Sequence, residues 1–202
     1  MSSPIKIKKF LEDQNILLIH HETVGSTMKE IKKHIGEKNI CMIANEQTEG
    51  IGRRGNQWIS PKGNIYLSFL FRYNLLIDKH FLFTAITANS ISRCLSNYIN
   101  QSINIKWPND ININDCKIAG IMTEIIQQNN KRYVIIGTGI NISKSPNIND
   151  YKTCCLNDFN TKIKNEEFLL NMLEIFFSEY QMILKKEYKN IIENFKNKMK
   201  YL

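Results

Sequence analysis

The side chains best able to do chemistry are concentrated in a glycine-rich segment near residue 50. Two adjacent arginines, Arg53 and Arg54, stand between Gly50, Gly52 and Gly55, in a chain whose 27 basic residues are mostly lysine. Guanidinium groups hold phosphate or carboxylate oxygens in bidentate geometry and stay charged at any working pH. Glycines let the backbone approach an anion closely and present its N–H groups. The segment therefore predicts a site for a negatively charged ligand.

The same glycines match G-x-G-x-x-G literally, which is the pattern of a dinucleotide-binding turn. That function requires the glycines to open a helix and an acidic residue to follow about 20 positions later. Here residues 57–63 contain Ser60-Pro61 and lead into an apolar strand, and residues 71–76 hold no acid. A Rossmann-type site is therefore not expected.

Three further segments place reactive side chains where strands are expected to begin or end. Asn109 and Asp110 follow a proline that interrupts one apolar stretch, and Lys117 begins another, close to Gly120. Asn141 ends a third stretch, after two glycines. A glycine inside a strand often marks a place where a ligand approaches the backbone. Arginine, lysine and aspartate at neighbouring strand ends can together hold an anionic nucleotide.

The elements that must position these residues are short strands alternating with helices. We expect strands at 16–19, 40–44, 66–71, 103–107, 118–126 and 133–142, the last two forming a hairpin, and a loop over 46–62. Thr27 and Glu30 have the spacing of a capping box and predict a helix that ends at Gly36. Further helices are expected at 81–99, from Asn165 onward, and in a lysine-rich final segment. This order predicts one α/β (α+β) domain with a mixed, largely antiparallel sheet flanked by helices.

Composition bounds the class of protein. The chain has 202 residues, 43% hydrophobic and 23% charged, which describes one globular domain. No apolar run approaches the roughly 18 residues of a membrane helix, and residues 1–6 carry no apolar targeting segment, which predicts a cytoplasmic protein without a membrane partner. Five cysteines without a C-x-x-C pair indicate neither a disulfide framework nor a metal site. The net charge of +8 leaves a nucleic-acid-binding module as one alternative, although a solvated lysine-rich surface explains it more simply.

Taken in chain order, these motifs resemble those of the biotin protein ligases. The resemblance covers roughly residues 23 to 142. The motifs that carry it are Gln47-x-x-Gly50-x-Gly52-Arg53-Arg54-Gly55-x-x-Trp58, Lys106-Trp107-Pro108-Asn109-Asp110, Lys117-x-Ala119-Gly120-Ile121 and Gly137-x-Gly139-Ile140-Asn141. It implies a catalytic domain related in fold to the class II aminoacyl-tRNA synthetases. It also implies an activity, in which biotin and ATP with Mg²⁺ form biotinyl-5′-AMP and the biotinyl group passes to a lysine of a biotin carboxyl carrier protein, the acyl-CoA carboxylase subunit.

The resemblance assigns roles residue by residue. Contact with biotin is implied for Ser26, Thr27, Gln47, Gly50, Gly52, Arg53, Lys117 and Gly120. Contact with ATP or the adenylate is implied for Arg53, Arg54, Trp58, Asn109, Lys117 and Asn141. The catalytic group is Arg53, Lys117 and Asp110, without a protein-bound metal. An apolar wall for the biotin rings and chain is expected from Trp107, Ile118 and Met122.

Several features depart from the family pattern. Met28 follows Ser26-Thr27 where asparagine is frequent, and Ile51 replaces a frequent arginine. The segments before Ser26 and after Asn141 are short, so we expect a single catalytic domain over 1–202, with neither an N-terminal DNA-binding domain nor the usual small C-terminal domain. DNA is accordingly not an expected partner. The alternative enzyme is a lipoate protein ligase, which shares the fold and the adenylation chemistry; the R-R-G-x-x-W segment favours biotin.

Overall fold

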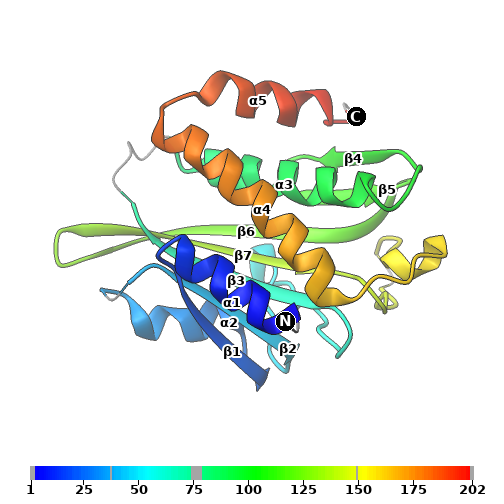
Figure 1. Ribbon diagram of the computed structural model, residues 1–202. Helices are drawn as coiled ribbons and strands as arrows, with labels where there is room; N and C mark the ends of the chain where they lie inside the picture. Colours follow the sequence, from blue (N-terminus) through cyan, green and yellow to red (C-terminus); the bar gives the residue numbers. More distant parts are fainter. Residues whose placement is uncertain (1–2, 37, 74–78, 149, 201–202) are drawn as a thin grey trace.

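The computed structural model describes residues 3–36, 38–73, 79–148 and 150–200 (Figure 1). Its centre is a seven-stranded sheet in the order β1-β2-β3-β7-β6-β5-β4. The strands are β1 (Leu17–Val24), β2 (Ile40–Gln47), β3 (Ile65–Arg72), β4 (Ile103–Lys106), β5 (Asp110–Ile113), β6 (Cys116–Gln128) and β7 (Lys131–Ile140). Only β1 and β2 pair in parallel, and the other pairs are antiparallel. The predicted mixed, largely antiparallel sheet is confirmed.

The larger apolar core lies between one face of the sheet and four helices (Figure 1). The helices are α1 (Ser3–Asp13), α3 (Phe81–Ser96), α4 (Asn165–Leu184) and α5 (Tyr188–Asn197). Phe176 of α4 stacks on Phe69 of β3 with ring centroids 4.8 Å apart. Every residue from 65 to 71 of that strand is buried. The face that carries the helices is thus closed, and the site must lie elsewhere.

A smaller apolar cluster covers part of the opposite face of the sheet, where α2 (Thr27–Glu30) and the 3-10 turn η1 (Ile31–His34) pack. The helix begins as predicted and the segment turns at Gly36, with φ +102°. The capping box is wrong: Ser26 occupies the N-cap position, and no side chain caps the helix. Thr27 is buried, and its hydroxyl instead donates to Gln47 Oε1 of β2.

Two elements were not expected from the sequence. The helix α1 packs Ile7 and Leu11 into the larger core. The strand β5 begins two residues after Pro108 and pairs with both β4 and β6, so the 103–107 segment and the hairpin belong to one continuous sheet. This short strand places Asp110 next to Gly120 of β6.

An irregularity in β6 decides which way its side chains point. Ile111 pairs with Ala119 while Asn112 pairs with Lys117, so β6 has one residue more than β5 at this point. An extra residue in one strand reverses the alternation of faces beyond it. Lys117 therefore faces the same side as Gly120, although an unbroken strand would place them on opposite sides.

The outer edge of the sheet is covered by the segment after α5. The N–H of Ile105 donates to Lys198 O over 2.7 Å, and the N–H of Lys200 donates to Ile105 O over 3.2 Å. Phe195 of α5 also packs on Trp107, with centroids 6.2 Å apart. These contacts support the turn between β4 and β5 from behind. The predicted domain covers residues 1–202, of which 1–2, 37, 74–78, 149 and 201–202 lie outside the described residues.

Candidate active site

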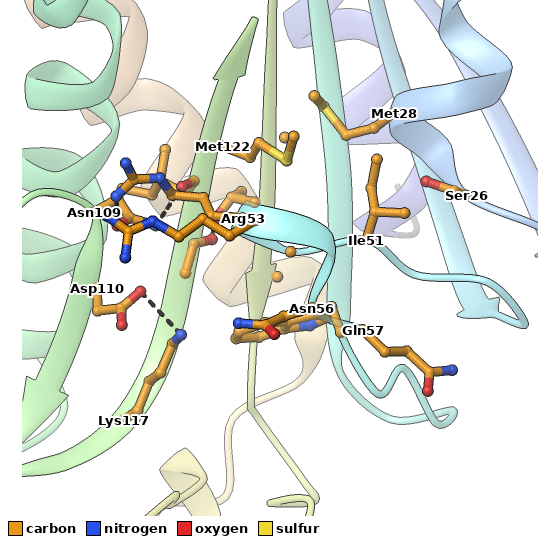
Figure 2. A pocket seen from close by; sticks show the side chains of 18 of the residues that line it. Ser26, Met28, Ile51, Arg53, Asn56, Gln57, Asn109, Asp110, Lys117 and Met122 are labelled. Carbon is orange, nitrogen blue, oxygen red and sulfur yellow. Dashed lines mark hydrogen bonds and ion pairs between the residues drawn. The ribbon is translucent and has the colours of Figure 1, made fainter. Parts of the chain in front are cut away.

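A cleft of about 530 Å³ opens on the face of the sheet opposite the four helices, beside the smaller apolar cluster. This volume lies within the range of small-molecule sites, roughly 300–1,000 Å³. Most of the residues implied by the resemblance line it: Ser26, Thr27, Gln47, Gly52, Arg53, Arg54, Trp58, Asn109, Asp110, Lys117 and Gly120. Figure 2 shows Ser26 and Met28 at one end of the cleft and Asp110 and Lys117 at the other.

One end of the cleft is a network of hydrogen bonds centred on Gln47. The backbone N–H and the hydroxyl of Thr27 donate to Gln47 Oε1 over 2.8 and 3.0 Å, and Gln47 Nε2 donates to Ser60 Oγ over 3.0 Å. The hydroxyl of Ser68 donates in turn to Thr27 Oγ1 over 2.8 Å. These bonds fix the orientation of the Gln47 amide, so the polar end is organised before any ligand arrives.

The hydroxyl of Ser26 has an unusual position in this end of the cleft. The residue is 2% exposed, and Ser26 Oγ has no hydrogen-bond partner among the described residues. An unpaired buried hydroxyl costs free energy, about 1–3 kcal/mol. Since Ser26 lines the cleft, a ligand with a hydrogen-bonding head would relieve that cost.

The glycine-rich segment forms a tight hairpin over the cleft. The N–H of Gly52 donates to Asn56 O over 2.7 Å, and Arg53 begins the short turn η2 (Arg53–Gly55). Arg53 Nη1 donates to Asn109 Oδ1 over 2.9 Å, and Asn109 Nδ2 donates to Ile121 O over 2.8 Å. Figure 2 shows Arg53 reaching across to Asn109 on the opposite wall. Arg54 also lines the cleft, but its backbone is left-handed, with φ +57°.

The glycines of the site mostly make room for side chains. A Cβ at Gly139 would lie 2.2 Å from Trp58 Nε1, and one at Gly120 would lie 2.9 Å from Trp58 Cζ3. The indole of Trp58 thus lies against β6 and β7. A Cβ at Gly137 would be 2.4 Å from Met28 Sδ. These glycines are needed because two large side chains of the cleft pack flat on the sheet.

The hairpin glycines differ from expectation in the same way. A Cβ at Gly50 would lie 2.3 Å from Trp58 O, and Gly50 does not line the cleft. Of the three glycines from 50 to 55, only Gly55 has a positive φ, at +81°. Close packing inside the hairpin therefore explains the glycine at position 50. The predicted left-handed backbone conformation, which would let the chain approach an anion, occurs among these glycines only at Gly55.

At the other end of the cleft, Lys117 and Asp110 form an ion pair with Nζ and Oδ1 2.9 Å apart. Their side chains are 16% and 25% exposed. Lys117 Nζ also lies 5.1 Å from the ring centroid of Trp58 and 5.0 Å from that of Tyr151. Burial and the charge of Asp110 raise the pKa of the Tyr151 hydroxyl. The lysine is thus held by neighbours on several sides.

Ile118 does not reach the cleft, and Asn141 lies beside it, where it lines a small adjoining pocket together with Trp58, Lys117 and Tyr151. Asn141 is 1% exposed, and its Nδ2 donates to Cys154 O over 3.1 Å, which ties the end of β7 to the segment that follows. Ile118 is fully buried in the larger core, because of the extra residue in β6. The apolar wall of the cleft comes from Met122 and Trp107, as expected, together with Met28 and Ile51.

Sequence reasoning missed three residues that shape the site. Ser60 and Ser68 complete the network around Gln47, and Tyr151 stands over Lys117. A polar residue inside the apolar run from Tyr66 to Phe71 was the available indication for Ser68. No local pattern singles out Tyr151, which lies in an irregular segment.

The charges around the cleft suit an anion. Among the lining residues that the structure describes, Arg53, Arg54 and Lys117 are cations, and Asp110 is the one carboxylate. The described part of the chain has no group of three or more His, Cys, Asp or Glu arranged to hold a metal ion. Within the same residues, no helix is long and apolar enough to cross a membrane.

Comparison with solved structures places the fold. The chain superposes on "Biotin protein ligase from Aquifex aeolicus in complex with biotin and ATP" with a TM-score of 0.78 and 26% identity, over 92% of this chain and 79% of that one. It also matches "Biotin Protein Ligase From Leishmania Major in complex with Biotinyl-5-AMP" with a TM-score of 0.70 and 26% identity, over 92% and 81%. The expected ligase-type sheet and helices are therefore confirmed.

Sequence comparison agrees. The chain is 34% identical over 135 residues to "Bifunctional ligase/repressor BirA" of Bacillus subtilis, which is 64% of this chain and 42% of that protein. It is 30% identical over 139 residues to "Biotin--protein ligase" of Homo sapiens, or 64% and 18%. The chain thus spans less than half the length of these curated relatives. The model of the biotin/lipoate A/B protein ligase family matches residues 20–141, more than half of the 202 residues, and the chain belongs to that family.

Proposed function

We propose that this protein activates biotin with ATP, as biotinyl-5′-AMP, and transfers the biotinyl group to a lysine of a biotin carboxyl carrier protein. One observation carries the proposal: a preorganised polar pocket at Ser26, Thr27 and Gln47 leads along one cleft to the cations Arg53 and Lys117. Biotin has a matching layout, with a hydrogen-bonding ureido head at one end and a carboxylate at the other.

The spare hydrogen-bonding capacity of the pocket favours such a head. Ser26 Oγ is buried without a partner among the described residues, and one Nε2 hydrogen of Gln47 remains after its bond to Ser60. The apolar side chains of Met28, Ile51 and Met122 line the cleft beside these groups. A ligand that is polar at its tip and apolar along its rings and chain fits this combination.

In the first step, a carboxylate oxygen of biotin attacks the α-phosphorus of ATP, and the bond to pyrophosphate breaks. Two anions must come together, so the step depends on cations that are already in place. Arg53 and Lys117 supply them from opposite walls of the cleft, and Asn109 holds the Arg53 guanidinium by its Oδ1. Trp58 offers a ring face for the adenine, and Arg54 adds positive charge at the mouth.

In the second step, the neutral amine of the acceptor lysine attacks the carbonyl carbon of the mixed anhydride. An amide bond forms, AMP leaves, and the amine gives up a proton. Asp110 is the carboxylate that lines this part of the described cleft, and its side chain is 25% exposed. We assign it to orient the amine and accept that proton.

The cleft does not form a magnesium site of its own. Mg²⁺ prefers an octahedral set of oxygen ligands. The single carboxylate lining the described cleft, that of Asp110, is ion-paired with Lys117. Magnesium would enter with the phosphates of ATP and would neutralise part of their charge. We place the activity in the cytoplasm, where ATP is available.

Calorimetric titration separates this proposal from its alternatives. Biotin should bind, ATP should bind more tightly after biotin, and lipoate and a duplex oligonucleotide should bind at least tenfold more weakly than biotin. Preference for lipoate would indicate a lipoate protein ligase, which is the other branch of the family. Preference for the oligonucleotide would indicate a nucleic-acid-binding module instead. The matched control is Gln47→Leu, which removes the amide and should abolish biotin binding while ATP still binds.

A further inference from the structure

The ammonium group of Lys117 lies close to two aromatic rings as well as to a carboxylate. Its Nζ lies 5.1 Å from the Trp58 ring centroid, 5.0 Å from the Tyr151 ring centroid and 2.9 Å from Asp110 Oδ1. Cations within about 6 Å of a ring centroid are attracted to the face of the ring. Lys117 is only 16% exposed, so solvent screens these contacts less than it would on an open surface.

The position of Tyr151 is coupled to that of Lys117 through the backbone. Thr153 forms a parallel bridge with Lys117, in which the Lys117 N–H donates to Lys152 O over 2.9 Å and the Cys154 N–H donates to Lys117 O over 3.0 Å. The carbonyl of Cys154 also accepts from Asn141 Nδ2. The segment that carries Tyr151 is therefore paired with the same strand that carries Lys117.

Ring faces hold a cation differently from a carboxylate. If Asp110 alone held Lys117, the ion pair would draw the ammonium toward β5 and neutralise its charge. A ring attracts the ammonium without neutralising it, so the N–H groups stay available for a second anion. Trp58, which packs against Gly120 and Gly139, contributes one such ring. Tyr151 contributes the other, at a similar distance from the ammonium.

We propose that Tyr151 is a positioning residue that holds the Lys117 ammonium in the cleft through its ring face. This inference rests on the proposed function for the identity of the anion, namely the biotin carboxylate and the phosphate of the adenylate. The hydroxyl is not required, because it makes no hydrogen bond to any described residue. The ring is 37% exposed, so its burial in the core does not explain its placement.

A ligand-free measurement tests the geometry directly. The Lys117 ε-methylene protons lie near two aromatic rings, so their NMR resonance should be displaced upfield by ring currents. Tyr151→Leu should move that resonance downfield, and Tyr151→Phe should leave it in place. Tyr188→Leu is the matched control, because it removes the ring under Lys79, another ring–cation pair remote from the cleft. An unchanged Lys117 resonance in Tyr151→Leu would overturn the proposal, whatever the protein binds.

A binding cycle tests the role in ligand recognition. Tyr151→Leu should weaken a hydrolysis-resistant biotinyl-adenylate analogue about two- to tenfold, while Tyr151→Phe binds as the parent does. Replacement by 3,4,5-trifluorophenylalanine, which keeps the shape of a phenyl ring but removes its negative face, should weaken binding as leucine does. In a Lys117→Gln background, Tyr151→Leu should have no further effect, because the ring then has no cation to hold.

Two results separate the failure of this inference from that of the proposed function. If Tyr151→Leu weakens the analogue equally in both backgrounds, Tyr151 contacts the ligand itself, and the positioning role is wrong. If the parent protein does not bind the analogue at all, the proposed function fails, and the Lys117 resonance alone decides whether the ring positions the ammonium.

Discussion

Replacing Arg53 with glycine should make the protein release its activated intermediate. The change removes one cation from the cleft and the contact of Nη1 with Asn109 Oδ1 at 2.9 Å, but it leaves the backbone hydrogen bonds of the hairpin intact. Biotinyl-adenylate reacts with any nearby amine, so an enzyme must retain it until the carrier arrives. A side chain that reaches across the cleft to the opposite wall is well placed to do so.

The structure sets the size of the effect. In the absence of ligand the Arg53 side chain is exposed, so its bond to Asn109 contributes little to stability. With the adenylate bound, the guanidinium has donors left for the phosphate, and a charge-assisted hydrogen bond shielded by the ligand contributes about 1.5–3 kcal/mol. At about 1.4 kcal/mol per factor of ten, its loss should raise adenylate release some ten- to a hundredfold.

Arg54→Gly is the matched control, because it removes the same charge from the neighbouring position. Arg54 has φ +57°, a conformation that glycine adopts more easily, so this variant should fold at least as well as the parent. Each protein is mixed with ATP, biotin and serum albumin, and the albumin is blotted with streptavidin. Arg53→Gly should label albumin strongly and Arg54→Gly weakly. An active Arg53→Gly variant that leaves albumin unlabelled, or stronger labelling by Arg54→Gly, would refute the assignment.

Three further changes follow from the geometry. Lys117→Gln should abolish adenylate formation while circular dichroism stays unchanged, and normal turnover in the folded variant would exclude a catalytic role. Gly139→Ala should weaken ATP binding at least tenfold, because its Cβ would lie 2.2 Å from Trp58 Nε1 and displace the indole; unchanged affinity by calorimetry would argue against adenine contact with that ring. Burial raises the pKa of Glu179, so the folded protein binds the carboxyl proton more tightly than the unfolded chain does. The free energy of unfolding should therefore be highest at low pH and fall as the pH rises from about 4.3, the pKa of an unfolded glutamate, through the raised pKa of the folded state. Glu179→Gln should remove this decline in urea midpoints, and an unaltered pH dependence would show that Glu179 does not cause it.

The central strands β3 and β7 could be predicted because most of their residues are apolar and buried. The segments around Phe69 and Ile136 are buried on both faces, and such runs are recognisable without knowledge of their neighbours. The helix α1 also has a recognisable pattern, with Ile7, Phe10 and Leu11 at helical spacing. The strand β5 is short and begins beside Pro108, so its pairing partners decide it more than its residues do.

The site divides in the same way. The resemblance to the biotin protein ligases implied that Ser26, Gln47, Arg53, Asp110 and Lys117 belong together, and all of them line one cleft. What the order of motifs cannot show is the direction of each side chain. The extra residue in β6 turns Lys117 toward the cleft and Ile118 into the core, and it has no signature in sequence.

Long-range packing accounts for the remaining differences. Asn141 matches a family motif, yet its buried amide bonds to a carbonyl of the following segment, and the residue lines a small pocket beside the cleft. Tyr151 approaches Lys117 only because that same segment bridges back to β6. Both facts depend on residues more than ten positions apart, so local patterns could not reveal them.

Isotopic exchange between pyrophosphate and ATP tests the central claim most directly, because it requires only the reversible first step and no carrier protein. The purified protein is incubated with labelled pyrophosphate, ATP and Mg²⁺, and label in ATP is measured with biotin, with lipoate and with neither. Exchange should depend on biotin and should disappear in Lys117→Gln. Exchange that is absent with biotin, proceeds without it or is supported better by lipoate would contradict the account.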